Sequence, residues 1–418
     1  MKSICVIGMG YIGLPTATMF ATHGLNVIGV DINEKIVSLL NEGELHIQEP
    51  GLRALFRESL ATGNLKISNT PEPADAFIIA VPTPITTDKN ADMTAVVAAT
   101  ESITSVLQNQ NLVVLESTSP PGTTIDLVKP ILERTGLKAG KDFYLAYSPE
   151  RVLPGRILQE LIDNDRIIGG IDPSSTQKTY DLYSTFVGGD ILLTDTTSAE
   201  LVKLLENTYR DVNIAIANEF SRIAHRFNVD IWEIIHLANK HPRVNILNPG
   251  PGVGGHCISV DPWFLVESAP DITPLIKTSR EVNDSQPYFI VDLVEQAINK
   301  IEGAKISVLG LTYKANVDDL RESPAIMVAN LLQKKGALVS AYDPFYPDMR
   351  FEKFKSMPTI DAAIKNTDLI LLLVAHNQFA KLTPDDINTL TPARTMIDTV
   401  NLWDKTDWEV AGFRFFSF

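Results

Sequence analysis

The feature of this sequence that most restricts its fold is a glycine pattern near the N-terminus. Gly8, Gly10 and Gly13 form a GxGxxG motif directly after a short apolar run, Ser3–Ile7, and directly before a stretch of helix-forming residues. In a strand–turn–helix unit the first glycine permits a tight turn, the second lets the backbone approach a pyrophosphate, and the third lets the helix pack on the strand. The motif therefore predicts a parallel α/β sheet with a dinucleotide site beside its first strand.

An acidic residue follows at the place where such a site needs one. Asp31 ends the second apolar run, Val27–Asp31, and stands 18 residues after Gly13. A carboxylate at this position accepts hydrogen bonds from the ribose diol of NAD and repels the 2′-phosphate of NADP. We therefore expect NAD. The residues expected to hold it are Gly8, Gly10, Tyr11, Ile12, Gly13, Asp31, Thr83 and Thr118.

The rest of the chain alternates between two patterns. Strands with helices between them are predicted over the first 150 residues, long helices from about Ser198, and strand–helix alternation again from about Ala304. Further strands are predicted at Leu65–Ser68, Ala76–Val81, Leu112–Glu116, Tyr144–Tyr147, Lys305–Leu309, Val339–Tyr342, Leu369–Val374 and Thr395–Asp398. Ser323 before Pro324 predicts the N-cap of a helix ending near Lys335. The fold class is α/β: two doubly wound, Rossmann-like domains, 1–195 and 301–418, joined by a long-helix domain, 196–300.

Composition excludes several classes of protein. The formal net charge of −15 makes the chain a poor general binder of nucleic acid. Its longest apolar run, Leu369–Ala375, is far shorter than the roughly 18 residues that indicate a membrane span. No signal peptide is recognisable, and two cysteines provide neither a disulfide framework nor a zinc-binding spacing. We expect a cytoplasmic protein without a metal site.

Cys257 is the first candidate for chemistry. It follows Gly254, Gly255 and His256 in a loop rich in glycine and proline. Most lone cysteines are small buried hydrophobic residues, and Cys5, inside the first predicted strand, has only that interpretation. A thiolate in a loop whose backbone N–H groups can face a reacting oxygen is instead a nucleophile for a carbonyl carbon.

Three polar residues form a stripe on the long helix. Lys203, Asn207 and Arg210 lie at positions i, i+4 and i+7 among apolar neighbours. One interpretation is a solvated face with a salt link between Glu206 and Arg210. The other is a base or an oxyanion stabiliser beside the cofactor.

Other candidates follow predicted strands or lie in loops, and each has a structural alternative. Glu150 lies past the sixth strand, where ligands of open α/β sheets bind, but it could be a surface carboxylate paired with Arg151. Thr118 could be a polar strand terminus, and Asp261 before Pro262 could be a helix N-cap. The cations that could hold an acidic substrate, or be surface charges, are Arg243, Lys314 and Arg321.

Several longer segments resemble the nucleotide-sugar 6-dehydrogenases. They are GMGYIGLP, VPTP, ESTSPPGTT, SPERVLPG, KLLENTYRDVNIAIANE, HPRVNILNPGPGVGGHCISVDPWF and DDLRESPA, in order over essentially the whole chain. Within this family, ERVLPG, HPRVNIL and VDPWF are similar to the branch that oxidises acetamido sugars. Pro154 stands where the UDP-glucose branch has a second glutamate, and His256 stands where that branch has serine.

The resemblance implies a reaction. The expected substrate is a UDP-sugar, UDP-N-acetylmannosamine ahead of UDP-N-acetylglucosamine or UDP-glucose, oxidised at C6 by four electrons in a homodimeric enzyme of polysaccharide biosynthesis. It implies that Cys257 is the nucleophile, that Lys203 and Asn207 stabilise oxyanions, and that Asp261, Thr118 and Glu150 place water or move protons. The residues expected to contact substrate are Glu150, Arg151, Lys203, Asn207, Arg210, Arg243, Gly254, Lys314 and Arg321, with Arg243 from the neighbouring subunit.

Two other classes share part of this pattern. A β-hydroxyacid dehydrogenase also has a Rossmann domain and a Lys-x-x-x-Asn pair on a long helix, but it needs neither Cys257 nor residues 304–418. A catalytically silent NAD-binding regulator would explain the GxGxxG glycines but would give no role to Cys257.

Overall fold

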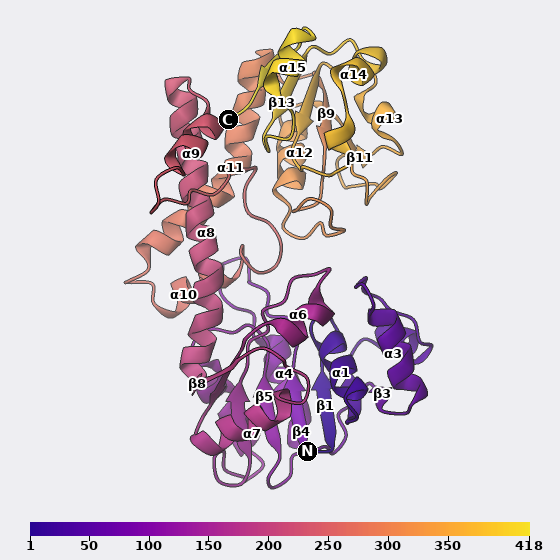
Figure 1. The fold of residues 1–418 in the computed structure, drawn as a ribbon, viewed down its shortest axis with the longest axis vertical. Coiled ribbons are helices and arrows are strands. Elements are labelled where there is room, and N and C mark those ends of the chain that lie inside the picture. The colour runs from indigo at the N-terminus through magenta and orange to yellow at the C-terminus, as the bar shows by residue number, and fades with distance from the viewer. The chain divides into compact units, whose positions relative to one another are not determined.

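The computed structural model describes all 418 residues, Met1–Phe418, and contains two β-sheets with helices packed against them (Figure 1). The chain divides into two compact units. The first unit comprises Met1–Glu206 and Trp263–Pro270, and the second comprises Asn207–Pro262 and Asp271–Phe418.

The sheet of the first unit has eight strands in the order β3-β2-β1-β4-β5-β6-β7-β8. All neighbouring pairs are parallel except β6 and β7, which are antiparallel. The strands are β1 (Ser3–Ile7), β2 (Asn26–Val30), β3 (Leu65–Ser68), β4 (Ala76–Ile79), β5 (Leu112–Leu115), β6 (Tyr144–Tyr147), β7 (Arg166–Gly170) and β8 (Ile191–Asp195). Each of the six strands predicted in this part exists, with ends that differ by two residues at most, whereas β7 and β8 were not predicted.

Helices bury both faces of the central strands of this sheet, which explains why β1, β4 and β5 are almost entirely apolar. Along β1, Ile4 and Val6 join one hydrophobic cluster, and Cys5 and Ile7 join the other. Burial raises the pKa of the Cys5 thiol to about 12, so Cys5 is a core residue, as predicted. The helical segments are α1 (Gly13–Thr22), α2 (Glu34–Asn41), α3 (Leu52–Ala61), α4 (Thr94–Thr104), η1 (Thr124–Val128), α5 (Lys129–Glu133), α6 (Ile157–Asp163) and α7 (Pro173–Tyr183).

Long helices occupy the middle of the chain, as the sequence predicts. Helix α8 spans Thr196–Phe227 and contains neither proline nor glycine. It is followed by α9 (Ile231–Ala238), α10 (Asp261–Ser268) and α11 (Pro274–Ile298). None of the helices combines the length and the apolar character that a membrane crossing would require.

The sheet of the second unit repeats the topology of the first. Its strands lie in the order β11-β10-β9-β12-β13-β14, and every neighbouring pair is parallel. This matches the order of the first six strands of the other sheet, so the prediction of two doubly wound sheets and a helical middle is confirmed. The elements are β9 (Lys305–Leu309), α12 (Pro324–Lys334), β10 (Leu338–Tyr342), β11 (Lys355–Ser356), α13 (Ile360–Ile364), β12 (Leu369–Leu372), η2 (Phe379–Lys381), α14 (Pro384–Leu390), β13 (Thr395–Asp398), α15 (Lys405–Val410) and β14 (Arg414–Phe416).

The start of α12 differs from the prediction in one respect. Ser323 precedes the helix with extended backbone angles, and Pro324 is the first helical residue, as predicted. The Ser323 hydroxyl, however, does not cap the helix, because it donates a hydrogen bond of 2.6 Å to the carbonyl oxygen of Leu311. The side chain therefore ties α12 to the segment after β9.

The packing of the second sheet leads to a stability prediction. Leu371 in β12 is 0% exposed, whereas Leu338 at the start of β10 is 59% exposed. We expect Leu371→Ala to lower the free energy of unfolding by about 2–5 kcal/mol, because it leaves a cavity, and the control Leu338→Ala to lower it by about 1 kcal/mol or less. Denaturant unfolding followed by tryptophan fluorescence measures both, since Trp403 and Trp408 are buried in this unit. Equal losses would contradict the described core.

Candidate active site

The three motif glycines of the first unit have three different surroundings. Gly8 has a left-handed backbone angle (φ +98°), and a Cβ atom there would overlap the carbonyl oxygen of Ala80. A Cβ atom on Gly13 would overlap the carbonyl oxygen of Gly8, so α1 packs closely on the turn. A Cβ atom on Gly10 would have no atom within 4 Å. Gly10 therefore faces open space, as a residue approached by a pyrophosphate must.

Asp31 lies directly after β2 and beside this turn. Its carboxylate accepts hydrogen bonds from the N–H groups of Met9 (3.0 Å) and Asn33 (2.9 Å). No side chain caps the N-terminus of α1, and no acidic residue lies in its first turn, so the positive end of the helix dipole suits phosphate. These residues fit NAD, with Asp31 placed for the ribose and α1 for the pyrophosphate.

Thr83 and Thr118 join two strand ends at the same edge of the sheet. Thr83 follows β4 and donates its hydroxyl to the main-chain oxygen of Thr118, which follows β5, over 2.6 Å. Both side chains are half-buried. The structure thus brings these two predicted cofactor residues together.

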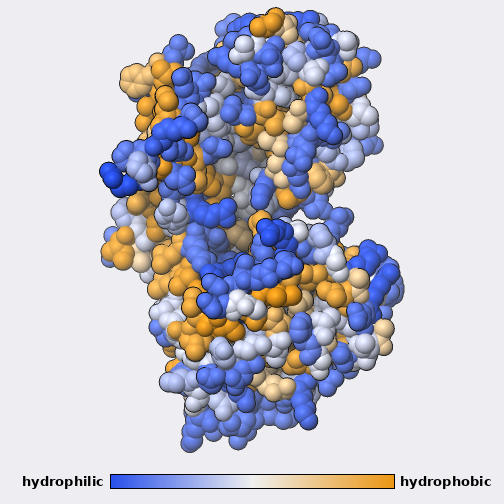
Figure 2. All heavy atoms as spheres, viewed as in Figure 1, coloured by the Kyte–Doolittle hydropathy of each residue, from blue (hydrophilic) through white to orange (hydrophobic).

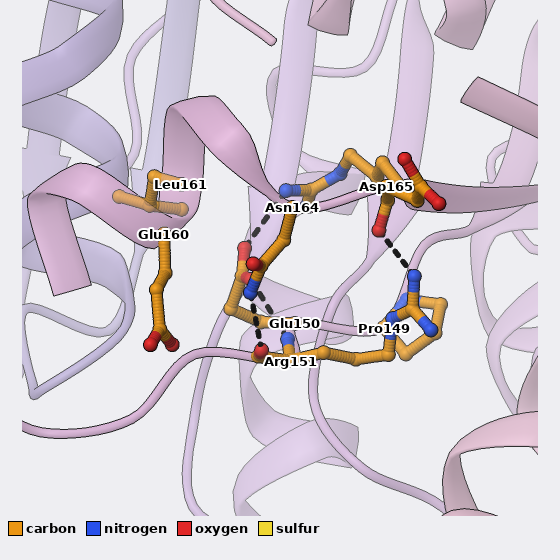
Figure 3. Close-up of a pocket in the computed structure, with 8 residues that line it drawn as sticks. Pro149, Glu150, Arg151, Glu160, Leu161, Asn164 and Asp165 are labelled. Atoms are coloured by element: carbon orange, nitrogen blue, oxygen red, sulfur yellow. Dashed lines mark hydrogen bonds and ion pairs between the residues drawn. The ribbon is translucent and has the colours of Figure 1, made fainter. Parts of the chain in front are cut away.

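Glu150 is not the surface carboxylate of the structural alternative. It follows β6, its side chain is only 8% exposed, and its Oε2 lies 2.8 Å from Nη1 of Arg166. Its Oε1 accepts the N–H of Arg151 over 2.7 Å. Figure 3 shows Glu150 and Arg151 among the residues that line a small pocket at this strand end. Glu150 is therefore held by Arg166, a residue that sequence reasoning did not single out.

The guanidinium of Arg151 pairs elsewhere. Its Nη1 lies 2.7 Å from Oε1 of Glu206 on α8. This pairing replaces the link between Glu206 and Arg210 that the helix spacing alone would give. On the same helix, Nζ of Lys203 donates to the main-chain oxygen of Glu150 over 2.8 Å. Lys203 and Glu150, which lie far apart in the sequence, are thus direct neighbours in the first unit.

Cys257 lies in the second unit, in a partly buried turn that leads into α10. Its main-chain oxygen accepts the N–H groups of Val260 (3.0 Å) and Asp261 (2.8 Å). The Asp261 carboxylate accepts the side-chain amide of Asn207 over 2.6 Å, and both residues are buried. Three of the predicted catalytic residues are therefore connected in one structural unit.

The two glycines before Cys257 serve the packing of this turn. Gly255 has a left-handed backbone angle (φ +82°), and its N–H donates to the main-chain oxygen of Arg321 over 3.0 Å. A Cβ atom on Gly254 would lie 2.6 Å from the main-chain oxygen of Glu322 and 2.7 Å from Cβ of Tyr313. The N–H of Gly255 is already bonded, so it is not one of the groups that could face a reacting oxygen.

Tyr313 is a further member of this cluster that sequence reasoning missed. It follows β9 by four residues and lies against Gly255, whose Cβ atom would approach its ring within 3.0 Å. Burial raises the pKa of Tyr313, the charges of Asp319 and Cys257 raise it further, and Arg321 and Arg210 oppose this. Its position after a strand end is the one signal that could have indicated it.

The predicted substrate cations have different surroundings. Arg321 is about half exposed and binds Asp319 through Nε (2.9 Å) and Nη2 (2.6 Å). Burial alone would raise the pKa of Asp319, but the hydrogen bonds and charge of Arg321 lower it overall. Arg210, Arg243 and Lys314 are exposed. The charges of Arg210 and Arg321 both lower the pKa of Tyr313, so the two residues lie near the cysteine turn.

The chain is similar to known proteins along nearly its whole length. Three models of the UDP-glucose/GDP-mannose dehydrogenase family match the chain: the NAD binding domain over residues 2–187, the central domain over 197–285 and the UDP binding domain over 307–405. Together they cover most of its length.

Individual relatives match over nearly the full chain. A UDP-N-acetyl-D-mannosamine dehydrogenase from Methanocaldococcus jannaschii is 48% identical, over 99% of this chain and 95% of its own. An NDP-N-acetyl-D-galactosaminuronic acid dehydrogenase from Ralstonia solanacearum is 46% identical, over 96% of each chain. The solved structure of a UDP-D-ManNAc dehydrogenase from Pyrococcus horikoshii superposes with a TM-score of 0.93 at 39% identity, over 100% of this chain and 99% of its own.

The open space at Gly10 leads to a prediction about NAD. We expect Gly10→Ala to fold normally, because its Cβ atom meets nothing in the protein, and to weaken NAD binding by about tenfold or more, equivalent to about 1.4 kcal/mol. Gly250→Ala, whose Cβ atom also meets nothing and which lies in the second unit, should keep the normal affinity. Titration calorimetry with NAD measures both. Unchanged affinity in Gly10→Ala would mean that the cofactor does not approach this glycine.

Proposed function

Because the chain belongs to the UDP-glucose/GDP-mannose dehydrogenase family, we propose that it oxidises UDP-N-acetyl-D-mannosamine at C6 to the uronate with two molecules of NAD. The relative named for this sugar that is 48% identical supports the choice of substrate. The observation that carries the proposal is the turn that presents Cys257 next to the buried Asn207–Asp261 pair. A simple alcohol dehydrogenase would have no use for a thiol in that turn.

The chemistry needs a covalent intermediate, which Cys257 supplies. Oxidation of the CH2OH group to an aldehyde removes the first hydride, and the aldehyde would hydrate or escape if it were free. The Cys257 thiolate adds to the aldehyde carbon and forms a thiohemiacetal. Removal of the second hydride leaves a thioester, and water cleaves the C–S bond to give the carboxylate and the regenerated thiol. NAD supplies the hydride acceptor in both oxidations.

The neighbouring groups act on oxygen and on protons. The Lys203 ammonium and the Asn207 amide stabilise the oxyanions that develop at C6, because both are hydrogen-bond donors on successive turns of α8. Asp261 holds the Asn207 amide and, with Thr118, places the water. Glu150 takes the proton of that water, and Arg166, whose Nη1 lies 2.8 Å from its Oε2, holds the carboxylate in place.

Basic residues bind the UDP-sugar. Arg151, Arg210, Lys314 and Arg321 provide positive charge for the diphosphate and hydrogen bonds to the sugar, and the exposed Arg243 reaches the substrate of the neighbouring subunit. Gly254 contributes its backbone, which lies beside Tyr313 and the cysteine turn. The three-part division of the chain at 1–195, 196–300 and 301–418 is supported by the three family-model matches.

A second candidate substrate has specific support. The Ralstonia relative is named NDP-N-acetyl-D-galactosaminuronic acid dehydrogenase and is 46% identical, within the 44–48% range of the mannosamine enzymes. Pro154 and His256 disfavour UDP-glucose, because that branch carries glutamate and serine at these positions. UDP-N-acetylglucosamine is retained as a further acetamido sugar for the assay.

Assembly as a homodimer is supported by an apolar stripe on α8. Tyr209, Ile216, Phe220, Ile223 and Phe227 are all exposed and recur at spacings of seven, four, three and four residues. This is the spacing of one helix face packed on another helix. Figure 2 shows hydrophobic side chains gathered where α8 and α9 run. A second copy of the chain, which carries the same stripe, would cover it.

A cytoplasmic location is supported by the cysteines. Cys5 and Cys257 are not joined in a disulfide, and the proposed nucleophile works only while Cys257 is reduced. A reducing compartment maintains that state.

The stoichiometry of NADH tests the proposed function. With purified protein and NAD, we expect about two NADH per UDP-N-acetyl-D-mannosamine consumed, because a primary alcohol becomes a carboxylate. UDP-N-acetylgalactosamine, UDP-N-acetylglucosamine and UDP-glucose are assayed in parallel, and a preference for one of them would replace the substrate. Cys257→Ala should lose uronate formation by about 10³-fold or more, whereas Cys5→Ala should keep it. One NADH per sugar, or a fully active Cys257→Ala, would contradict the thioester route.

The apolar stripe predicts the effect of a charge on assembly. Ile223→Glu should convert a dimer of about twice 46.0 kDa into monomers, because a buried unpaired carboxylate costs several kcal/mol per subunit. Val410→Glu on α15 replaces an apolar residue that is 84% exposed outside the stripe and should leave the dimer intact. Sedimentation velocity distinguishes the two. A dimeric Ile223→Glu protein would exclude this face.

A further inference from the structure

One arginine in the first unit is surrounded by polar groups from several elements. Arg166 is the first residue of β7, and its side chain is 4% exposed. Its Nη1 lies 2.8 Å from Glu150, its Nη2 lies 2.6 Å from Glu116, and its Nε donates to the Ser148 hydroxyl over 2.9 Å. All three nitrogens of the guanidinium are therefore engaged.

The remaining contacts of this group are also buried. The Arg166 guanidinium stacks over the ring of Tyr183 at 3.8 Å. The Tyr183 hydroxyl donates to Oε1 of Glu116 over 2.5 Å, while Oε2 of Glu116 is buried without a hydrogen-bond partner. A buried group of two carboxylates and one cation costs desolvation energy and leaves one oxygen unsatisfied, so it is a poor device for stability alone.

We propose that Arg166 is a positioning residue for the dehydrogenase reaction, which fixes the Glu150 carboxylate and, through the Glu150 main chain, the Lys203 ammonium. The inference rests on the proposed function, which gives Glu150 and Lys203 their roles. Glu116 and Tyr183 belong to the same device, because they hold Arg166 from the opposite side.

The hydrogen bonds of Glu150 show how the device acts. Arg166 holds Oε2, and the N–H of Arg151 holds Oε1, so the carboxylate cannot rotate freely. The main-chain oxygen of the same residue receives the Lys203 ammonium over 2.8 Å. One anchored residue thus sets both the carboxylate that activates water and the cation that faces the oxyanion. Arginine suits this task, since its planar guanidinium holds donors at three separate nitrogens in a rigid fork, whereas a lysine has one nitrogen whose donors rotate freely.

The buried group contains two carboxylates but only one cation. Arg166 is shared between Glu150 and Glu116, with Tyr183 on α7, Arg151 after β6 and Lys203 on α8 as the other titratable neighbours. Glu160 and Asp165 line the same pocket as Glu150. Burial raises the pKa of Glu116; Arg166 opposes this rise and the charge of Glu150 adds to it. An ionised Glu116 therefore competes with Glu150 for the positive charge of Arg166, and a neutral Glu116 competes less.

Because Glu150 and Glu116 share Arg166, substitutions of Arg166 and of Glu116 should shift the pH–rate profile in opposite directions. Uronate release from the thioester needs a base to activate water, so its rate falls at low pH and gives the pH–rate profile an acid limb. Arg166→Lys weakens the contact that favours the carboxylate and should move this acid limb to higher pH by about one unit. Glu116→Gln removes the competing carboxylate and should move the limb to lower pH by about half a unit or more. Tyr183→Phe, which withdraws a donor from Glu116 and favours its neutral form, should move it in the same direction as Glu116→Gln.

The experiment is a single-turnover assay of the full-length enzyme with NAD and UDP-N-acetyl-D-mannosamine from pH 5.5 to 9. NADH is followed by absorbance, and uronate is quantified after quenching. Glu200→Gln is the matched control, because Glu200 is a fully buried carboxylate of the same unit that bonds Gly122 and Thr124. This control should lose stability without moving the acid limb.

Each outcome decides a separate point. Opposite shifts for Arg166→Lys and Glu116→Gln support the inference. Shifts of the same sign, or none, in folded variants would overturn it and leave the proposed function intact. If Arg166→Lys does not fold, downward shifts in both Glu116→Gln and Tyr183→Phe support the inference, and their absence overturns it. A wild-type protein that releases no uronate would overturn the proposed function and this inference together.

Discussion

The turn at the end of the central strand is the constraint on which both sheets depend. Gly8 follows β1 and Gly310 follows β9, both with left-handed backbone angles (φ +98° and +91°). A Cβ atom would overlap Ala80 in the first case and Val374 in the second, where the next strand of each sheet ends. The freed N–H groups bind the ends of the neighbouring strands, Gly8 to Val30 over 2.8 Å and Gly310 to Tyr342 over 2.9 Å. Each sheet thus makes the same turn by the same means.

This turn determines where chemistry can occur. In a parallel sheet all the carboxyl ends lie at one edge, so residues that follow different strands become neighbours there. Asp31, Thr118 and Glu150 follow β2, β5 and β6 of the first sheet. In the second unit Tyr313 follows β9 and packs on the turn that carries Cys257. These candidate groups are thus supplied by strand ends, whereas Cys257 comes from a turn and Lys203 and Asn207 come from α8.

The sequence predicted those features of the fold that depend on a few neighbouring residues. The glycine motif, Asp31 and the apolar strands were recognisable because turn geometry and burial on both faces act over a few residues. Strands β7 and β8 were missed, since β7 begins with Arg166 and ends in two glycines, and β8 has an apolar run of only three residues, is largely exposed and shows no clear alternation.

Partners far apart in the sequence could not be predicted from spacing. Arg166 meets Glu116 across 50 residues, and Arg151 meets Glu206 across 55, in place of the local Glu206–Arg210 pair. Likewise the Ser323 hydroxyl binds Leu311 and leaves its helix uncapped. Tertiary geometry, which brings together strand ends and helices, decides each of these contacts.

The two sheets differ in the carboxylate after their second strand, and this difference assigns the dinucleotide to the first. Asp31 is partly exposed and accepts two backbone N–H groups, Asn33 of its own loop and Met9 of the glycine turn, so its oxygens can also accept a ribose diol. Asp343 occupies the equivalent position after β10 but is 0% exposed. Its Oδ2 accepts the N–H groups of Leu311 and Thr312 and lies 3.2 Å from Nε2 of the buried His376. A ligand cannot reach a carboxylate that protein groups surround. The second sheet therefore has the same turn as the first but no carboxylate that could bind a ribose.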